Sequence, residues 1–376
     1  MKLRWKYFLV LLVASLTPMM AVTLISQNAS KKLGESISNQ TQAALMENVR
    51  REIVSATENY AMITRRSKAA MEFALAALVR EASISLNSHP PEPSKIYFAA
   101  DFEDPARAPE DLAPSSFHMQ IRADGSLAPK QVSYEHPNFL LAPGVDPSAA
   151  KDDIAKALRL KPALAAISRE LEDSLLWLYA CTESGVHISY PGHGGYPEGY
   201  DPRQRRWYTR AQKKNGMDWG PPIVDATTKQ LTFTVSAPFH DSEGAIVGVA
   251  AIDILIPNVL LKSMIASQWS KRMKSFLVGR SHPDAEGERE IWILSQEEQA
   301  YAAGYKGSHP KGGLYFDVRR KAFAEVLPLF EEKKSGSFEG PYQGEDSFWA
   351  FASIFSDLHF VIIAPKAMIM ELPEEV

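Results

Sequence analysis

The chain is short of several residue types, and each shortage excludes a class of protein. Its 376 residues include one cysteine, Cys181, so neither an internal disulfide nor a cysteine-based metal cluster can form. A formal net charge of −4 argues against a nucleic-acid binder that relies on a basic surface. No Gly-x-Ser-x-Gly motif occurs, so no nucleophile elbow is present.

What is present indicates a folded protein with a membrane segment. Hydrophobic residues make up 45% of the chain and charged residues 23%, which is enough apolar material for a packed core. The length suits two ordinary domains in addition to one membrane span. A single cysteine is compatible with the cytoplasm and with a Gram-negative periplasm.

The amino terminus predicts a membrane anchor. Lys2, Arg4 and Lys6 precede residues 7–25, which are uncharged and mostly apolar. This length suits one crossing of a bilayer, and the basic flank places the amino terminus in the cytoplasm. The alternative is a cleaved signal peptide. We favour an uncleaved anchor, because no small-x-small cleavage site is clear and helical sequence continues directly from the span.

A long helix is expected after the anchor. Between residues 30 and 86 there is no proline, Gly34 is the only glycine, and apolar residues recur at helical spacing. A helix this long that rises from a membrane is either a coiled coil or a stalk packed against a domain. The proline-rich run 89–93 ends it.

Residues 94–171 contain no chemistry that the sequence identifies. We expect a strand at 117–122 and a helix at 151–171, which has acidic residues in its first turn. His118 and His136 are expected in surface or loop positions.

Two hairpins are predicted downstream. The first joins 175–181 to 186–190 through a glycine-containing turn. The second runs from Leu231 to Ile254, and its first strand alternates apolar with hydroxyl side chains.

Two histidines in this part of the chain raise the question of a metal site. His187 and His193 lack a third ligand at the usual spacing, so a metal site is not expected. The loop at 190–197, which surrounds His193 with glycines, is expected to line a pocket.

An aromatic and basic cluster lies between the hairpins, where residues 200–208 read Tyr-Asp-Pro-Arg-Gln-Arg-Arg-Trp-Tyr. Arg205 offers a planar fork of donors that suits a carboxylate, whereas Asp225 and Asp253 offer acceptors that suit an ammonium group. Such a site fits a small zwitterion, of which a free amino acid is the simplest. The alternative is a structural ion pair between Arg205 and either aspartate, with the aromatic side chains in the core.

Asp253 favours the binding site over the structural pair. It sits in an almost continuous apolar run, residues 245–254. A carboxylate there is poorly solvated, and a buried charge needs a partner.

The stretch from Tyr200 to Ile254 resembles the membrane-distal half of a double Cache (dCache) sensor domain. The resemblance rests on the 200–208 run, on Asp225, and on the Val-Ser-Ala-Pro strand that precedes Gly-Val-Ala-Ala-Ile-Asp. In members of this family that bind amino acids, a pattern of aromatic residues, one arginine and two aspartates marks the site. In this sequence the pattern falls on Tyr200, Arg205, Trp207, Tyr208, Asp225 and Asp253.

The resemblance implies roles for these residues. Arg205 and Trp207 would hold the ligand carboxylate, and Asp225 and Asp253 would hold its amine. One position departs from the pattern, because Ile223 stands where a tyrosine is common. The resemblance also implies a long helix that leads from the membrane span along both lobes.

Residues 257–365 predict a second, smaller α+β lobe. Helices are expected at 257–273 and 319–332, and strands at 275–278, 291–294, 336–342, 347–355 and 359–364. The lobe lacks an Arg-x-Trp-Tyr motif, so we assign it packing and signal relay. Residues 365–376 are acidic and contain no second span, whereas sensors of this family usually continue through one into an output domain. The alternatives are a truncated gene product, a separate sensory subunit that signals through an output protein on another chain, and an anchored binding protein.

Together these features predict an α+β protein with an N-terminal transmembrane helix, a long stalk helix and two PAS-like antiparallel-sheet lobes. The expected units are a cytoplasmic flank and anchor at 1–28, a stalk helix at 29–88, a membrane-distal ligand-binding lobe at 89–256, a membrane-proximal lobe at 257–365 and a C-terminal tail at 366–376.

The predicted function is that of a membrane-anchored sensory module that binds a small ligand, most simply a free amino acid, for signal transduction. The alternatives are the same fold sensing an amine or a carboxylate, and a non-signalling anchored binding or interaction protein. No enzymatic activity, cofactor or nucleic acid is expected. The expected partners are the ligand, the membrane and a second copy of the chain, paired through the long helix. The chain is expected to cross the inner membrane once, with its bulk periplasmic or extracellular.

Overall fold

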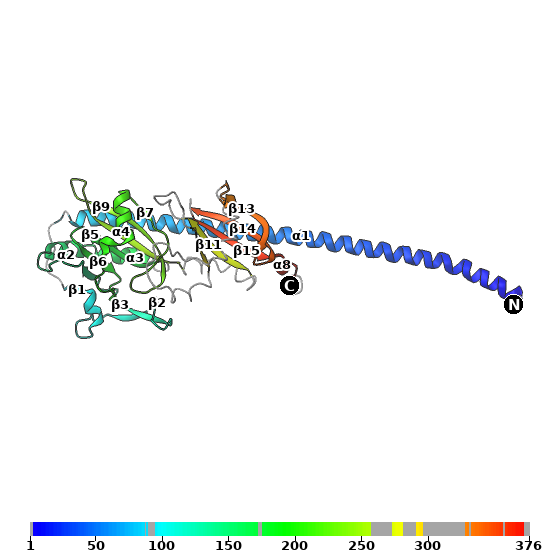
Figure 1. The fold of residues 1–376 in the computed structure, drawn as a ribbon, viewed down its shortest axis with the longest axis horizontal. Helices are drawn as coiled ribbons and strands as arrows, with labels where there is room; N and C mark the ends of the chain where they lie inside the picture. The colour runs from blue at the N-terminus through cyan, green and yellow to red at the C-terminus, as the bar shows by residue number, and fades with distance from the viewer. Residues whose placement is uncertain are drawn as a thin grey trace.

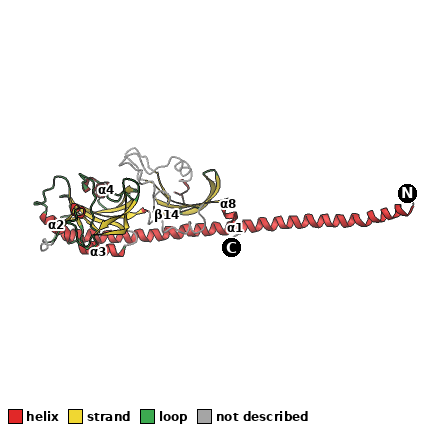
Figure 2. Cartoon of the chain, turned by 90° about the horizontal axis from the view of Figure 1, so that it is seen from below, coloured by secondary structure: helices red, strands yellow, loops and turns green. Residues whose placement is uncertain are grey.

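The computed structural model describes residues 3–86, 88, 95–171, 175–256, 273–280, 291–295, 328–330, 332–355 and 358–371. Within these ranges the chain forms one long helix, α1 (Leu3–Leu86), and two sheets that lie along it (Figures 1 and 2). This is the predicted α+β architecture.

Helix α1 has an exposed first half and a half-buried second half. Its side chains up to residue 44 are exposed wherever they are described. Beyond that point one face is buried at spacings of three and four residues, which is the period of an α-helix. These buried residues are Val49, Ile53, Tyr60, Met71, Leu75, Leu78 and Ala82. The predicted stalk is thus a packing helix along both lobes.

Of the residues that the structure describes, α1 holds the one segment long and apolar enough to cross a bilayer. The helix contains Pro18 within this apolar part. The helix ends at Leu86, and the proline-rich run at 89–93 lies outside the described residues.

The first lobe is built on an eight-stranded sheet. Seven strands follow the order β1-β4-β6-β5-β10-β9-β7, with β8 pairing with β9, and all neighbours are antiparallel except β1 and β4. The strands are β1 (Tyr97–Phe98), β4 (Asn138–Leu141), β5 (Leu175–Thr182), β6 (Val186–Tyr190), β7 (Asp218–Trp219), β8 (Ile223–Val224), β9 (Leu231–His240) and β10 (Ile246–Leu255). Both predicted hairpins, β5–β6 and β9–β10, are confirmed.

The two faces of this sheet differ because side chains alternate along each strand. One face carries Leu178, Ile188, Val235 and Ile252, which pack with α1 in an apolar core. The opposite face carries a polar set: Tyr179, His187, Ser189, Thr232, Thr234, Ser236 and Asp253.

The polar face is covered by short elements. The 3-10 helix η2 (Pro202–Gln204) leads into α4 (Arg206–Lys214), whose Trp207, Tyr208 and Ala211 pack against β5 and β10. A two-stranded sheet of β2 (Ala113–Ile121) and β3 (Leu127–Val132) contributes Val132 to the same cluster. The 3-10 helix η1 (Ala99–Glu103) precedes β2.

The helix predicted at 151–171 is wrong in one respect, because it is two helices. They are α2 (Lys151–Leu158) and α3 (Lys161–Glu170). Pro162 lies in the first turn of α3 and has no N–H to bond the carbonyl of Leu158, so the first helix cannot run on through it.

The second lobe is a five-stranded antiparallel sheet of order β12-β11-β15-β14-β13. Its strands, all predicted, are β11 (Lys274–Arg280), β12 (Ile291–Ser295), β13 (Ser335–Tyr342), β14 (Glu345–Phe355) and β15 (Leu358–Pro365). The helix expected at 257–273 and most of the one expected at 319–332 lie outside the described residues. A short helix that was not predicted, α8 (Lys366–Glu371), follows β15.

The second sheet packs on α1 as the first does. The ring of Tyr60 on α1 lies 3.9 Å from that of Phe360 on β15, centroid to centroid. At the junction of the lobes, Trp219 of β7 donates to Glu72 of α1 at 2.9 Å and lies 5.9 Å from the ring of Phe355 on β14.

Candidate functional site

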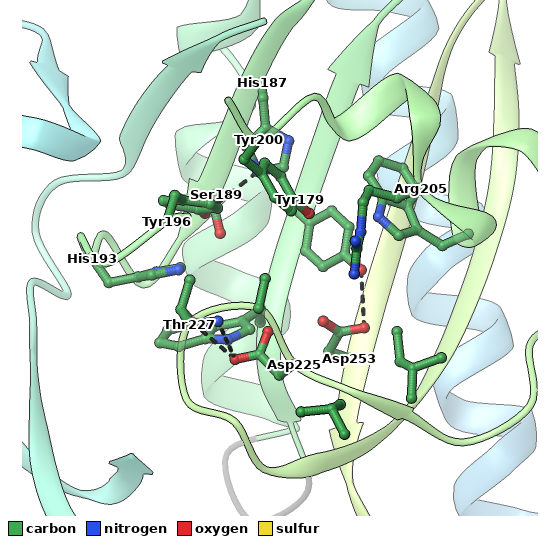
Figure 3. Close-up of a pocket in the computed structure, with 15 residues that line it drawn as sticks. Tyr179, His187, Ser189, His193, Tyr196, Tyr200, Arg205, Asp225, Thr227 and Asp253 are labelled. Carbon is green, nitrogen blue, oxygen red and sulfur yellow. Dashed lines mark hydrogen bonds between the residues drawn. The ribbon is translucent and has the colours of Figure 1, made fainter. Parts of the chain in front are cut away.

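A cavity opens on the polar face of the first sheet, between β5, β6 and β10 on one side and the 190–230 segments on the other (Figure 3). Its volume is about 30 Å³, which is room for roughly two water molecules. The strands contribute Trp177, Tyr179, His187, Ser189 and Asp253. The covering segments contribute His193, Tyr196, Tyr200, Arg205, Trp207, Ile223, Val224, Asp225, Ala226 and Thr227.

Five of the six residues on which the pattern falls line this cavity: Tyr200, Arg205, Trp207, Asp225 and Asp253. The sixth, Tyr208, is not among the lining residues. It is buried in the cluster between α4 and the sheet, and its hydroxyl has no hydrogen-bond partner within the described residues. Ile223, which departs from the pattern, also lines the cavity.

The local sequence places Arg205 between two helical segments. The Asp201 carboxylate caps η2 by accepting from the Arg203 backbone N–H at 3.0 Å, and Arg205 follows with extended dihedrals (φ −77°, ψ 148°). Its carbonyl accepts from the N–H of Tyr208 at 3.0 Å, at the start of α4. The Trp207 carbonyl accepts from the Ser236 hydroxyl at 2.8 Å, which ties α4 to β9.

Arg205 differs from the arginines near it. Arg203 pairs with Asp201 at 2.9 Å, and Arg210 pairs with Asp218 at 2.7 Å. Arg205 makes no ion pair or hydrogen bond with its side chain in the part of the chain that the structure describes. Its guanidinium carbon lies 5.4 Å from the centroid of the Tyr200 ring, a cation–π contact. The structural ion pair with Asp225 or Asp253 that the sequence left open is therefore not formed among these residues.

Asp225 is held in a turn by donors that converge on one of its oxygens. Its Oδ1 accepts from the backbone N–H of Thr227 at 3.1 Å and of Thr228 at 2.6 Å, and from both hydroxyls. The residue is buried, with 7% of its surface exposed. No donor to Oδ2 is found in the described residues, so this oxygen remains available at the cavity.

Asp253 repeats this arrangement on the sheet. Its Oδ1 accepts from the Tyr179 hydroxyl at 2.9 Å and from the Thr234 hydroxyl, whereas its Oδ2 has no donor among the described residues. Burial, with the nearby Asp225 charge as a second cause, raises the pKa of Asp253 to about 7. The hydrogen bonds to Asp253 are therefore not enough to stabilise its ionised form fully.

The histidines line up in a stack that the sequence did not predict. His118 is buried rather than at the surface, and its ring stacks on Trp177 at 4.7 Å. Trp177 in turn stacks on His193 at 3.6 Å, which stacks on Tyr196 at 5.2 Å. Burial lowers the pKa of His118 to about 4 and that of His187 to about 3, and it holds the pKa of His193 well below its usual value. These imidazoles are neutral at pH 7.

No group of three or more histidine, cysteine or acidic side chains that could hold a metal ion occurs within the described residues. The cavity is instead a mixture of one cation, two carboxylates, neutral imidazoles and aromatic rings. Sequence reasoning missed the lining residues Trp177, Tyr179 and Ser189. Their signal was present, because each sits at a period-two position facing the same side as Asp253.

Comparisons with known proteins match the segment that contains this cavity. Residues 168–259 match the family model described as methyl-accepting chemotaxis protein-like, first PDC sensor domain. All the residues that line the cavity fall within this segment.

Two curated relatives are chemoreceptors. McpB of Bacillus subtilis is 32% identical over 104 residues, which is 27% of this chain and 13% of McpB. PscA of Pseudomonas syringae pv. tomato is 30% identical over 134 residues, which is 34% of this chain and 20% of PscA. The chain therefore matches a fifth or less of the length of these relatives.

A solved structure also aligns with the fold. The ligand-binding domain of the Pseudomonas fluorescens chemoreceptor CtaA, in complex with L-isoleucine, is 15% identical and has a TM-score of 0.46. The alignment covers 88% of this chain and 98% of that one. The match of residues 168–259 to a chemoreceptor-type PDC sensor domain agrees with the double Cache resemblance of the sequence pattern.

Proposed function

We propose that the first lobe binds a free amino acid by its α-carboxylate and α-ammonium groups, as the ligand-recognition part of a membrane-anchored sensor. The observation that supports this most is the charge arrangement around one cavity. The Arg205 side chain has no ion pair or hydrogen bond among the described residues, and Asp225 and Asp253 each have one oxygen without a donor. An α-amino acid brings one charge of each sign to these groups.

Ligand binding would provide opposite charges for the buried charged groups of the cavity. Burial and, as the second cause, the nearby Asp225 charge disfavour ionisation of Asp253 and raise its pKa. A ligand ammonium between the two carboxylates provides the missing opposite charge, and a ligand carboxylate does the same for Arg205. Charge-assisted hydrogen bonds of this kind are the stronger ones in proteins.

The experiment is calorimetry on the full chain in detergent micelles with the twenty amino acids. The best ligand is then compared with two of its analogues, one lacking the carboxylate and one lacking the amine. We expect both analogues to bind at least a hundredfold more weakly. Failure of every amino acid to bind would refute the proposal.

A second candidate ligand is a simple amine. The carboxylates outnumber the cation in the cavity, because Asp225 and Asp253 face Arg205 alone. If the analogue without a carboxylate binds as tightly as the amino acid, and if its affinity does not change in Arg205→Ala, the site recognises an amine.

The sensor role, the location and the unit boundaries follow from this proposal together with α1. The apolar part of α1 would anchor the chain in the inner membrane by a single pass, with residues 29–88 as stalk and both lobes in the periplasm or outside the cell. The signal would pass to a downstream protein. Mass spectrometry of the mature protein that shows a start beyond residue 25 would exclude the anchor.

A homodimer through α1 is part of the same proposal. Outside the apolar span, α1 exposes Leu33, Ile37 and Phe73, and Phe73 is 80% exposed. A second copy of α1 would cover such residues. Because Cys181 is buried and is the only cysteine, Leu33→Cys offers a clean cross-link. Absence of a cross-linked dimer in membranes, with and without ligand, would argue against it.

A further inference from the structure

The cavity has a second end that the charged groups do not use. Figure 3 shows His193, Tyr196 and Ser189 on the side of the cavity away from Arg205. Together with His187 and Trp177 they form the wall that a ligand side chain would meet once Arg205, Asp225 and Asp253 held its α-carbon groups. We call these five residues the side-chain wall.

Three polar atoms of the side-chain wall are buried without hydrogen-bond partners in the described residues. They are the indole Nε1 of Trp177, the Nδ1 of His187 and the hydroxyl Oγ of Ser189, which can both donate and accept. The other ring nitrogen of His187, Nε2, lies 3.5 Å from the Tyr196 hydroxyl, so the ring has one free position. A buried polar atom without a hydrogen bond lowers the stability of the protein. A ligand group that bonded to such an atom would remove this cost, and the gain would appear as affinity.

The hydrogen-bonding capacity of these atoms determines which group of a ligand can pair with them. An indole N–H is a donor only, and a neutral imidazole has one donor and one acceptor. A side chain that presents a carbonyl oxygen can accept from the indole, and an adjacent NH₂ can donate to an imidazole acceptor. A carboxamide provides both a carbonyl oxygen and an NH₂, whereas an aliphatic side chain provides neither and would leave all three atoms unpaired.

The charge of the cavity argues against an ionised side chain. With Arg205, Asp225 and Asp253 all ionised, the cavity carries one net negative charge, and the histidines of the side-chain wall add none. A second ligand carboxylate would add a further anion. A second ligand ammonium would find no carboxylate in the side-chain wall, which holds no acidic residue.

One nearby group favours a competing ligand. Lys130 is buried next to the 190–197 loop and does not line the cavity. A Cβ placed on Gly195 of this loop would lie 2.7 Å from the Lys130 Nζ. If the loop gave access to this ammonium, an acidic side chain would be preferred. The cavity is also small, at about 30 Å³, so the covering segments would have to move apart to admit an amino acid, and a short side chain of either kind requires the smallest movement.

We infer that the side-chain wall selects amino acids with a short carboxamide side chain over those with an aliphatic or an acidic one. This inference rests on the proposed function, because it assumes that the α-carboxylate and α-ammonium are held at the other end. It assigns Trp177 and His187, which lie outside the family pattern, as specificity-determining residues.

The test uses three amino acids of nearly equal shape. Asparagine, leucine and aspartate branch identically at Cγ and differ in the terminal atoms alone. Calorimetry on the full chain in detergent should give a dissociation constant for asparagine at least tenfold below those for leucine and aspartate. Leucine binding as tightly as asparagine overturns the inference and leaves the proposed function intact. Aspartate binding tightest overturns it in favour of Lys130.

Two substitutions check the assignment to residues. His187→Phe and Trp177→Phe keep a planar ring. The first removes both imidazole nitrogens, including the Nε2 beside the Tyr196 hydroxyl, and the second removes the indole Nε1 together with one of the fused rings. Either should reduce the preference for asparagine over leucine to below about threefold while leucine affinity stays the same or improves. An unchanged preference in a folded variant overturns the role of that residue. If no amino acid binds the wild-type chain, the proposed function fails first, and this inference fails with it.

Discussion

The two lobes of this protein pack on the same helix with the same kind of sheet, yet they differ on the face turned away from it. In the first lobe that face carries buried Thr234, Tyr179 and Asp253 around a cavity. In the second lobe the corresponding face carries Phe276, Trp349 and Val361 in a closed apolar cluster. The buried polar residues described on that face are few: Ser347 and His359.

The difference indicates which face of each sheet can carry a binding site while the lobe stays folded. Each sheet needs one apolar face to pack on α1, and both lobes keep it. The opposite face is free to vary, because alternation along the strand separates the two sets of side chains. The first lobe uses this freedom for polar groups, and the second uses it for packing.

The largest expected effect comes from placing a carboxylate in the second lobe. Val361→Asp would put a charge in the apolar cluster, where no described side chain can pair with it, and should cost about 4 kcal/mol or more of stability. Val361→Thr is nearly isosteric and is the matched control. Thermal unfolding should show a large loss for the first variant and a modest one for the second. Equal melting temperatures for wild type and Val361→Asp would mean that the two faces are not different in kind.

The next largest effect is on ligand affinity. Arg205→Ala should weaken binding of the best amino acid at least a hundredfold, about 3 kcal/mol, because the ligand carboxylate loses its cation inside a buried site. Arg206→Ala is the control, since Arg206 is exposed and does not line the cavity. The melting temperature without ligand should barely change in either variant. Normal affinity in Arg205→Ala would remove Arg205 from the site.

A third effect tests the raised pKa of Asp253. The folded protein binds a proton at this carboxyl up to about pH 7, whereas an unfolded aspartate loses it near pH 4. This group therefore makes the ligand-free fold less stable as pH rises from about 4 to about 7. Asp253→Asn should remove this slope, which urea unfolding at a series of pH values measures as the difference between variant and wild type.

Ligand binding should show the opposite sign. An ammonium group needs the ionised carboxylate, so affinity should fall as pH drops below about 7, and binding should release protons. Asp218→Asn is the control, because Asp218 is as buried as Asp253 but pairs with Arg210 and Lys214 away from the cavity. A pH-independent affinity in the wild type would contradict the role of Asp253.

The smallest effect concerns the junction between the lobes. Trp219→Phe removes the hydrogen bond to Glu72 while keeping the ring against Phe355, and should cost about 1 kcal/mol. If the lobes behave as one unit, unfolding of the variant should remain a single transition. Two separate transitions would show that this junction couples them.

Much of the fold could be predicted from the sequence because its signals are local. The hairpins β5–β6 and β9–β10 have alternating side chains and short turns, and α1 has a helical period without prolines beyond Pro18. The pairing of β5 with β10 could not be predicted from such signals. It joins strands far apart in the chain, and this pairing brings Tyr179 to Asp253.

The site residues that could be predicted are those that belong to the double Cache-like sequence pattern. The pattern named Trp207 and Tyr208 together, without predicting a helix for them. The structure places both on α4, where consecutive residues point about 100° apart. Trp207 faces the cavity and Tyr208 therefore faces the core. His118 was misjudged for a related reason, because burial by a distant strand leaves no trace in the residues around it.

The continuity of α1 has a mechanical consequence. From the end of the apolar span to its first half-buried residues near 45, the helix crosses about 30 Å, and a further 40 Å or so separates that point from Met71 under the first lobe. A continuous hydrogen-bonded helix of this length does not shorten. A force applied near the cavity would therefore shift or rotate α1 as a whole, including its apolar span. The second lobe packs on the same helix through Tyr60, between the first lobe and the apolar span, so such a movement would have to preserve or break the contact of Tyr60 with Phe360.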